Sequence, residues 1–163
     1  LLEIGKAEVL RDFSNNGGRK VALFPLGNMM SIGRQTAQVL TDGGYDVALI
    51  NPRFAKPLDT EVIERLGRKA EVLVTFEDAA VAGGFGSALL EVLNEKRVLT
   101  PVIQIGWPDQ FIEHATTVDD LRAKYGLTVE NAVARVSAEF GSPAIGGNGF
   151  AGARAAVPAV SQR

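Results

Sequence analysis

The chain has 163 residues, of which 46% are hydrophobic, so we expect one domain with its own core rather than two. Its formal net charge of −2 provides no basic surface for nucleic acid or anionic lipid, and neither is expected as a partner. The absence of cysteine excludes disulfides and thiolate metal sites, and it agrees with a reducing compartment: the cytoplasm, or the plastid stroma in a plant-type source.

The N-terminal stretch and the first strands set the fold class. "LLEIGKAEVLRD" (1–12) ends at the turn-like "SNNGG" (14–18) without a helix before the next strand, so we expect it to join the sheet antiparallel at an edge. Four runs rich in Val, Ile, Leu and Phe then predict strands that are covered on both faces. They are "KVALFPLG" (20–27), "YDVALINP" (45–52), "AEVLVTFE" (70–77) and "RVLTPVIQIG" (97–106).

Segments of helical length separate these strands. Ser31 is expected to cap the first helix and Asp59 the second. A third helix follows the glycines at 83–86, with an apolar stripe formed by Ala88, Leu89, Val92 and Leu93. Strands that alternate with helices predict an α/β fold with three α/β/α layers around a five-stranded, mostly parallel mixed sheet that has one antiparallel edge strand.

Two more helices are predicted after the last strand. The first is capped by Thr116 or Thr117 and ends at Gly126. The second, "TVENAVARVSAEF" (128–140), has apolar residues at helical spacing and should pack on the sheet. We therefore expect one domain over residues 1–140 and a flexible Gly-, Ala- and Pro-rich tail over residues 141–163. Because the chain starts at Leu1 rather than methionine, we expect it to be a segment of a longer protein.

The glycine-rich "GGFGSALLEV" (83–92) raises the question of phosphate binding. Leu89 stands where a dinucleotide-binding fingerprint needs a small residue, and no Lys-Ser or Lys-Thr pair follows, so we favour a structural role for the glycines. Phosphate binding by free amides at the helix N-terminus is the alternative. Glu77 ends the strand that leads to this loop, and we expect it either to be buried with a partner such as Arg53 or to lie in water.

Other polar groups suggest weaker sites. His114 is the single histidine, which rules out a multi-histidine metal site. A carboxylate pair for Mg²⁺ could come from Glu77 with Asp78, or from Asp109 with Glu113, although such pairs more often face solvent or cap helices. "IGWPDQFIEH" (105–114) places large apolar residues outside regular structure, which indicates a surface covered by a partner domain or subunit.

Several long motifs resemble one family in the same order along about residues 1–136. "LEIGKAEVLR", "NPRFAKPLD", "LVTFEDAAVAGGFGSALLEVL", "VIQIGWPDQFIEH" and "LRAKYGLTVENAVARV" are similar to the C-terminal domain of the 1-deoxy-D-xylulose-5-phosphate synthases, which belong to the transketolase superfamily. "RFAKPLD" would also fit the β subunits of 2-oxoacid dehydrogenases, whereas "IGWPDQFIEH" followed by "KYGL" points to the synthases. The chain departs from the family pattern at Asp78, at Phe85 and after Phe140.

The resemblance implies a function for the parent protein. Enzymes of this family condense pyruvate with glyceraldehyde 3-phosphate and release carbon dioxide, and two preceding domains hold thiamine diphosphate and Mg²⁺. The third domain, which this chain resembles, helps to hold the homodimer together, and the chain lacks the family's GDG motif. We therefore expect no catalytic, cofactor-binding or metal-binding residue here, and an inactive isolated chain.

The partners implied are the other domains of the same enzyme and a second subunit. Candidate interface residues are Arg53, Glu77, Gly83, Gly84, Gly86, Trp107, Asp109, Phe111 and His114. A free-standing α/β module that binds a nucleotide or another anion is the alternative of a different class.

Overall fold

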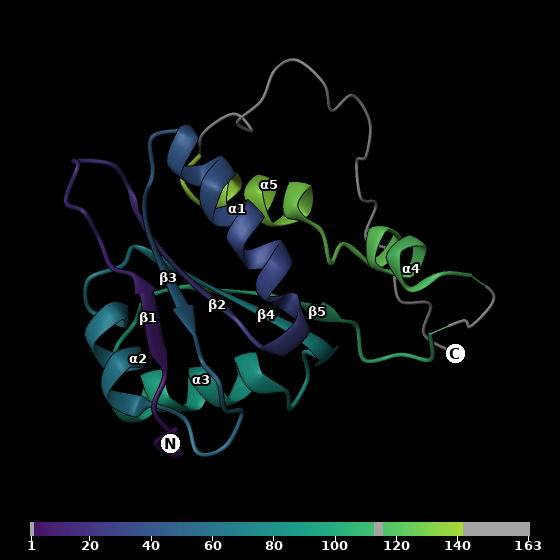
Figure 1. The fold of residues 1–163 in the computed structure, drawn as a ribbon, viewed down its shortest axis with the longest axis horizontal. Coiled ribbons are helices and arrows are strands. Elements are labelled where there is room, and N and C mark those ends of the chain that lie inside the picture. The colour runs from purple at the N-terminus through teal and green to yellow at the C-terminus, as the bar shows by residue number, and fades with distance from the viewer. Residues whose placement is uncertain (1, 113–115, 142–163) are drawn as a thin grey trace.

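One mixed sheet organises the computed structural model, which describes residues 2–112 and 116–141. The strand order is β1-β3-β2-β4-β5, with β1 antiparallel to β3 and the other neighbours parallel (Figure 1). The strands are β1 (Glu8–Arg11), β2 (Lys20–Pro25), β3 (Asp46–Asn51), β4 (Val72–Ala80) and β5 (Val102–Trp107). The predicted α/β class, the mixed sheet and the antiparallel edge strand are all confirmed.

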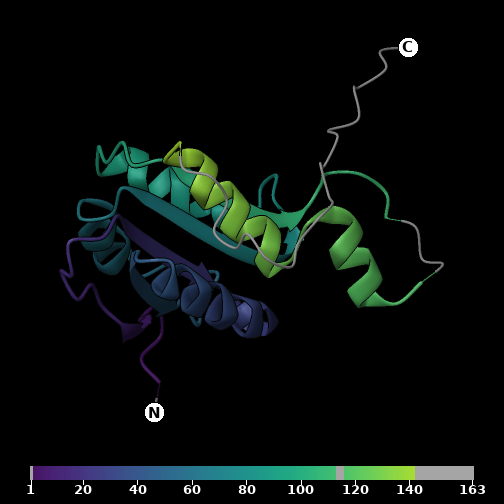
Figure 2. The ribbon, with the colours of Figure 1, turned by 90° about the horizontal axis from the view of Figure 1, so that it is seen from above.

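Helices cover both faces of this sheet. They are α1 (Met30–Asp42), α2 (Thr60–Gly67), α3 (Phe85–Glu95), α4 (Val118–Tyr125) and α5 (Val129–Glu139), and a short 3₁₀ turn, η1 (Gly27–Met29), precedes α1. The clusters of buried side chains place α1 and α5 on one face and α2 and α3 on the other. α4 stands away from the sheet, beyond the end of β5 (Figures 1 and 2).

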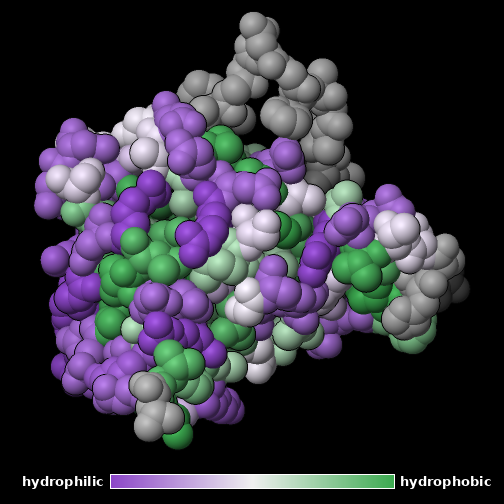
Figure 3. Space-filling model, viewed as in Figure 1, coloured by the Kyte–Doolittle hydropathy of each residue, from purple (hydrophilic) through white to green (hydrophobic). Residues whose placement is uncertain are grey.

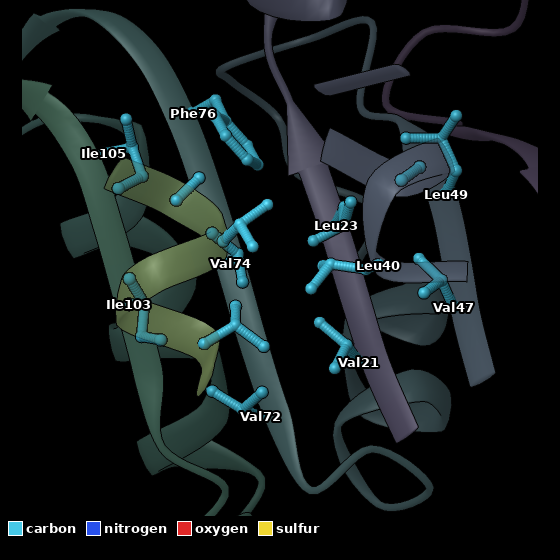
Figure 4. Packing of buried hydrophobic residues seen from close by; sticks show 14 of the residues in the cluster. Val21, Leu23, Leu40, Val47, Leu49, Val72, Val74, Phe76, Ile103 and Ile105 are labelled. Atoms are coloured by element: carbon cyan, nitrogen blue, oxygen red, sulfur yellow. The ribbon is translucent and has the colours of Figure 1, made fainter. Parts of the chain in front are cut away.

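The core consists of two apolar layers, one on each face of the sheet. Successive residues of β2 feed both layers, because Val21 and Leu23 point toward α1 and α5 while Ala22 and Phe24 point toward α2 and α3. Figure 4 shows the first layer, which brings together Val21, Leu23, Leu40, Val47, Leu49, Val72, Val74, Phe76, Ile103 and Ile105. This burial on both faces explains the continuous apolar runs in the sequence.

Most helix ends follow the predicted side chains. Asp59 caps α2 by accepting from the Val62 amide at 3.1 Å, and the Thr117 hydroxyl accepts from the Asp120 amide at 3.2 Å at the start of α4. The prediction for Ser31 is wrong. Met29 is the N-cap of α1, because η1 runs directly into the helix and supplies its first turn.

Residues 142–163 lie outside the described residues, so the division into a domain and a tail at residue 141 stays a prediction. Within the described ranges, no helix combines the length and apolarity that a bilayer crossing requires.

Candidate functional site

The carboxylate of Glu77 caps the N-terminus of α3 from inside the protein. Glu77 is 1% exposed; its Oε2 accepts from the Phe85 amide at 2.7 Å and its Oε1 from the Gly86 amide at 2.9 Å. A carboxylate at this position satisfies two amides that have no partner within the helix, and the helix dipole favours its negative charge. The predicted partner Arg53 is wrong, because its guanidinium pairs with Glu8 at 3.0 Å.

Two glycines let α3 approach this carboxylate. A Cβ on Gly84 would collide with the Glu77 carboxylate and the Ala80 carbonyl oxygen. A Cβ on Gly86 would lie 2.6 Å from the Thr75 hydroxyl and 2.5 Å from the Gln104 amide nitrogen. The prediction of a structural role for these glycines is therefore confirmed: they permit close approach of a helix to a strand.

The same arrangement bears on anion binding. A phosphate at the α3 N-terminus would have to displace a buried carboxylate that already occupies the Phe85 and Gly86 amides, and its charge would be repelled by that carboxylate. In the portion of the chain that the structure covers, no three His, Cys, Asp or Glu side chains are grouped to hold a metal ion. The described donor set therefore does not fit the diphosphate and Mg²⁺ of thiamine diphosphate.

Asp78 connects three elements at the end of β4. It accepts from the side-chain amide of Asn28 at 2.5 Å, from Trp107 Nε1 at 2.7 Å and from the Arg122 guanidinium at 2.8 Å. Glu77 and Asp78 thus contact different elements, α3 in the first case and η1, β5 and α4 in the second, and the suggested Mg²⁺ pair does not converge.

The surroundings of Asp78 favour its charged form. Partial burial alone would raise the pKa of this carboxyl group, but the hydrogen bonds from Asn28, Trp107 and Arg122, together with the positive charge of Arg122, outweigh burial and lower the pKa. The link between α4 and the sheet therefore depends on an ionised Asp78.

The residues around Trp107 differ from the prediction in one respect. Trp107 ends β5 rather than lying outside regular structure, and its ring packs edge-on against Tyr125 of α4, with centroids 5.9 Å apart. Asp109 is exposed and Phe111 is 82% exposed. His114 and Glu113 lie outside the described residues.

The structure brings the described candidate residues to one side of the sheet. Arg53 follows β3, the glycines follow Glu77 of β4, and Asp109 and Phe111 follow β5. We call this side, where the parallel strands end, the carboxyl edge. Glu77 and Gly86 are buried within the chain and offer no surface to another protein, whereas the other described candidates are half-buried (Arg53, Gly84, Trp107) or exposed (Gly83, Asp109, Phe111). That such a protein covers them stays a prediction.

We predict unequal costs for alanine at two adjacent glycines. Gly84→Ala should lower the free energy of unfolding by about 2–4 kcal/mol, because its Cβ overlaps the Glu77 carboxylate and a backbone oxygen. Gly83→Ala is the matched control: its Cβ enters open space, so only the positive φ of 72° costs about 1 kcal/mol. Urea unfolding followed by circular dichroism measures both, and equal costs would contradict the close approach.

We also predict a local acid transition at Asp78. The pKa of Asp78 in the folded chain lies below the ordinary value of 3.8. The ionised carboxylate therefore contributes fully to the free energy of unfolding above 3.8, and this contribution is lost as the pH falls through the lowered pKa. The fluorescence of Trp107, the single tryptophan, should show an acid transition whose midpoint lies below 3.8.

The variant Asp78→Asn supplies the control for this titration. It removes the charge that holds Arg122, so its Trp107 emission should already differ at neutral pH and should lack the acid step that Asp78 causes. Asp12, Asp46 and Asp120 also have lowered pKa values, which makes the comparison of the two proteins necessary. Identical fluorescence titrations of the unchanged chain and of Asp78→Asn would refute the link between Asp78 and Trp107.

Comparison with known proteins places the chain in a family. The family described as "Transketolase, C-terminal domain" matches residues 5–132. The 1-deoxy-D-xylulose-5-phosphate synthase of Methylacidiphilum infernorum (isolate V4) is 50% identical over 133 residues, which are 82% of this chain and 20% of that protein. The synthase of Acidobacterium capsulatum is 44% identical over 136 residues, which are 83% of this chain and 21% of that protein.

A solved structure supports the same assignment. "Split gene transketolase, inactive beta4 tetramer" is 33% identical with a TM-score of 0.75, and the match covers 86% of this chain and 44% of that one. The chain spans about a fifth of the length of the curated synthases that it matches. The sequence match, the mixed sheet and the structural likeness agree: the chain belongs to the transketolase C-terminal domain family.

Proposed function

We propose that this chain is the C-terminal domain of a 1-deoxy-D-xylulose-5-phosphate synthase, and that it acts in assembly rather than in cofactor chemistry. The parent enzyme would condense pyruvate with glyceraldehyde 3-phosphate, with thiamine diphosphate and Mg²⁺ held by its preceding domains. The observation that carries the proposal is the 50% identity over 133 residues to a synthase. "IGWPDQFIEH" (105–114) and "KYGL" (124–127) lie within the shared region and favour a synthase over a 2-oxoacid dehydrogenase subunit.

The geometry of the glycine loop supports a non-catalytic role. The Phe85 and Gly86 amides, which a phosphate group would need, are bonded to the buried Glu77 carboxylate. This arrangement argues against the stand-alone nucleotide- or anion-binding module as well as against a cofactor site.

The structural neighbour supports a role in assembly. That protein is described as a split-gene transketolase whose beta chains form an inactive tetramer. By analogy, this chain would contribute subunit contacts, including those of a homodimer, without turning over substrate on its own. The proposal includes a cytoplasmic location, which the absence of cysteine favours.

Two measurements test the proposal. In titration calorimetry, the isolated chain should give no saturable heat with thiamine diphosphate and Mg²⁺, and it should release no carbon dioxide from pyruvate. A chimera that joins the preceding part of the M. infernorum synthase to residues 1–141 of this chain should be dimeric and active, whereas the preceding part alone should have lost dimerisation and activity. The intact M. infernorum synthase is the positive control.

Either of two results would contradict the proposal. Tight cofactor binding by the isolated chain would show that it carries a site of its own. A chimera that neither assembles nor turns over, beside an active positive control, would show that this chain does not replace the synthase domain.

A further inference from the structure

The tip of the loop between β1 and β2 is an asparagine followed by a glycine. Asn16 and Gly17 are both exposed, and a Cβ on Gly17 would have no atom within 4 Å. This loop joins the first two strands in Figure 1, and polar residues dominate the face that Figure 3 shows. An asparagine that precedes glycine is prone to lose its side-chain amide, because glycine has no side chain to screen its own backbone nitrogen. The geometry of the two groups decides whether a folded chain undergoes this reaction.

Both reacting groups are prepared for it. The Asn16 side chain folds back over the peptide that follows, because its Oδ1 accepts from the Gly18 amide at 2.8 Å. This hydrogen bond polarises the side-chain carbonyl group, and it stabilises the negative charge that develops on the oxygen when a nucleophile adds. Across the described ranges, no hydrogen bond has the Gly17 amide as its donor. The attacking nitrogen is therefore not engaged elsewhere.

Two anchors hold this arrangement against the body of the domain. Before the tip, the buried carboxylate of Asp46 accepts from the Ser14 and Asn15 amides at 2.8 Å. After the tip, Gly18 packs so closely that a Cβ there would collide with the Gly44 carbonyl oxygen. The amide that stabilises the side-chain oxygen therefore has a fixed position, while the tip itself stays open to solvent.

The other asparagines that the structure describes lack this combination. Asn51 precedes a proline, whose nitrogen carries no hydrogen. Asn94 and Asn131 lie within α3 and α5, where the next amide is bonded inside the helix. Asn15 and Asn28 precede residues whose side chains screen the nitrogen.

We propose that Asn16 is a site of spontaneous deamidation. The Gly17 nitrogen attacks Cγ of Asn16, so that a new C–N bond forms and the bond from Cγ to the side-chain nitrogen breaks. The leaving nitrogen takes the proton of the Gly17 amide and departs as ammonia, which leaves a cyclic succinimide. Solvent water then opens the ring. Attack at Cγ gives aspartate, and attack at the main-chain carbonyl gives isoaspartate, whose backbone runs through the former side chain. Nothing is oxidised or reduced.

The test follows the asparagines of the full chain over time. The protein is incubated at neutral and at mildly alkaline pH, and peptide mass spectrometry measures the loss of each side-chain amide. The readout is resolved by peptide because Asn148-Gly149 is the same dipeptide and lies outside the described residues. Two references need no substitution: Asn94, which is exposed but helical, and a synthetic peptide of residues 12–20, which has the sequence of the loop without the fold.

Two variants test the role of the Gly17 nitrogen. Gly17→Ala adds a methyl group that screens this nitrogen and enters open space, at a φ of 86°. Gly83→Ala is the matched control, because it also enters open space at a positive φ, of 72°, in another loop. Circular dichroism verifies that both variants keep the fold.

The expected result is rapid conversion at one position. Asn16 should convert more than about tenfold faster than Asn94 and at least as fast as in the synthetic peptide, with both aspartate and isoaspartate as products. The rate should rise with pH, because loss of the amide proton makes the nitrogen a nucleophile. Gly17→Ala should slow conversion at position 16 by about tenfold or more, whereas Gly83→Ala should leave it unchanged.

Three results would overturn the inference. Slower conversion of Asn16 in the folded chain than in the peptide would show that the fold holds the two groups apart. An unchanged rate in Gly17→Ala would show that the Gly17 nitrogen is not the nucleophile. Aspartate without isoaspartate would show direct hydrolysis of the side chain and no succinimide.

Discussion

The buried carboxylate of Glu77 is the constraint on which the carboxyl edge depends. A charge that is 1% exposed is costly unless it accepts hydrogen bonds, and Glu77 accepts from the Phe85 and Gly86 amides. The N-terminus of α3 must therefore lie against the end of β4. This position leaves no room for a side chain at Gly84, which explains why the loop carries glycine there.

The residue after Glu77 organises the other side of the same edge. Asp78 accepts hydrogen bonds from Asn28, Trp107 and Arg122, and it thereby joins η1, the end of β5 and α4. Two other aspartates join segments of the chain by accepting from backbone amides. Asp46 is 1% exposed and accepts from the Ser14 and Asn15 amides at 2.8 Å, while Asp59 accepts from Ala7 as well as from α2. Carboxylates bonded to backbone amides thus hold these loops against the strand or helix that carries the aspartate.

The fold was predictable because its signals are local. Alternating apolar runs and helical stripes gave the sheet and its edge strand, and Asp59 and Thr117 stand next to the helices that they cap. The site was less predictable. Arg53 and Glu8, like Asp78 and Arg122, are far apart in sequence, and only the register of β1 on β3 and the placement of α4 bring them together.

The protein's own Glu77 carboxylate, and not a ligand, occupies the N-terminus of α3. Nuclear magnetic resonance of the Phe85 and Gly86 amides tests this most directly. Their hydrogens should exchange slowly with solvent, and their chemical shifts should not respond to added pyrophosphate. Saturable shifts of these two amides with pyrophosphate, absent in a remote amide such as Leu99, would contradict the account.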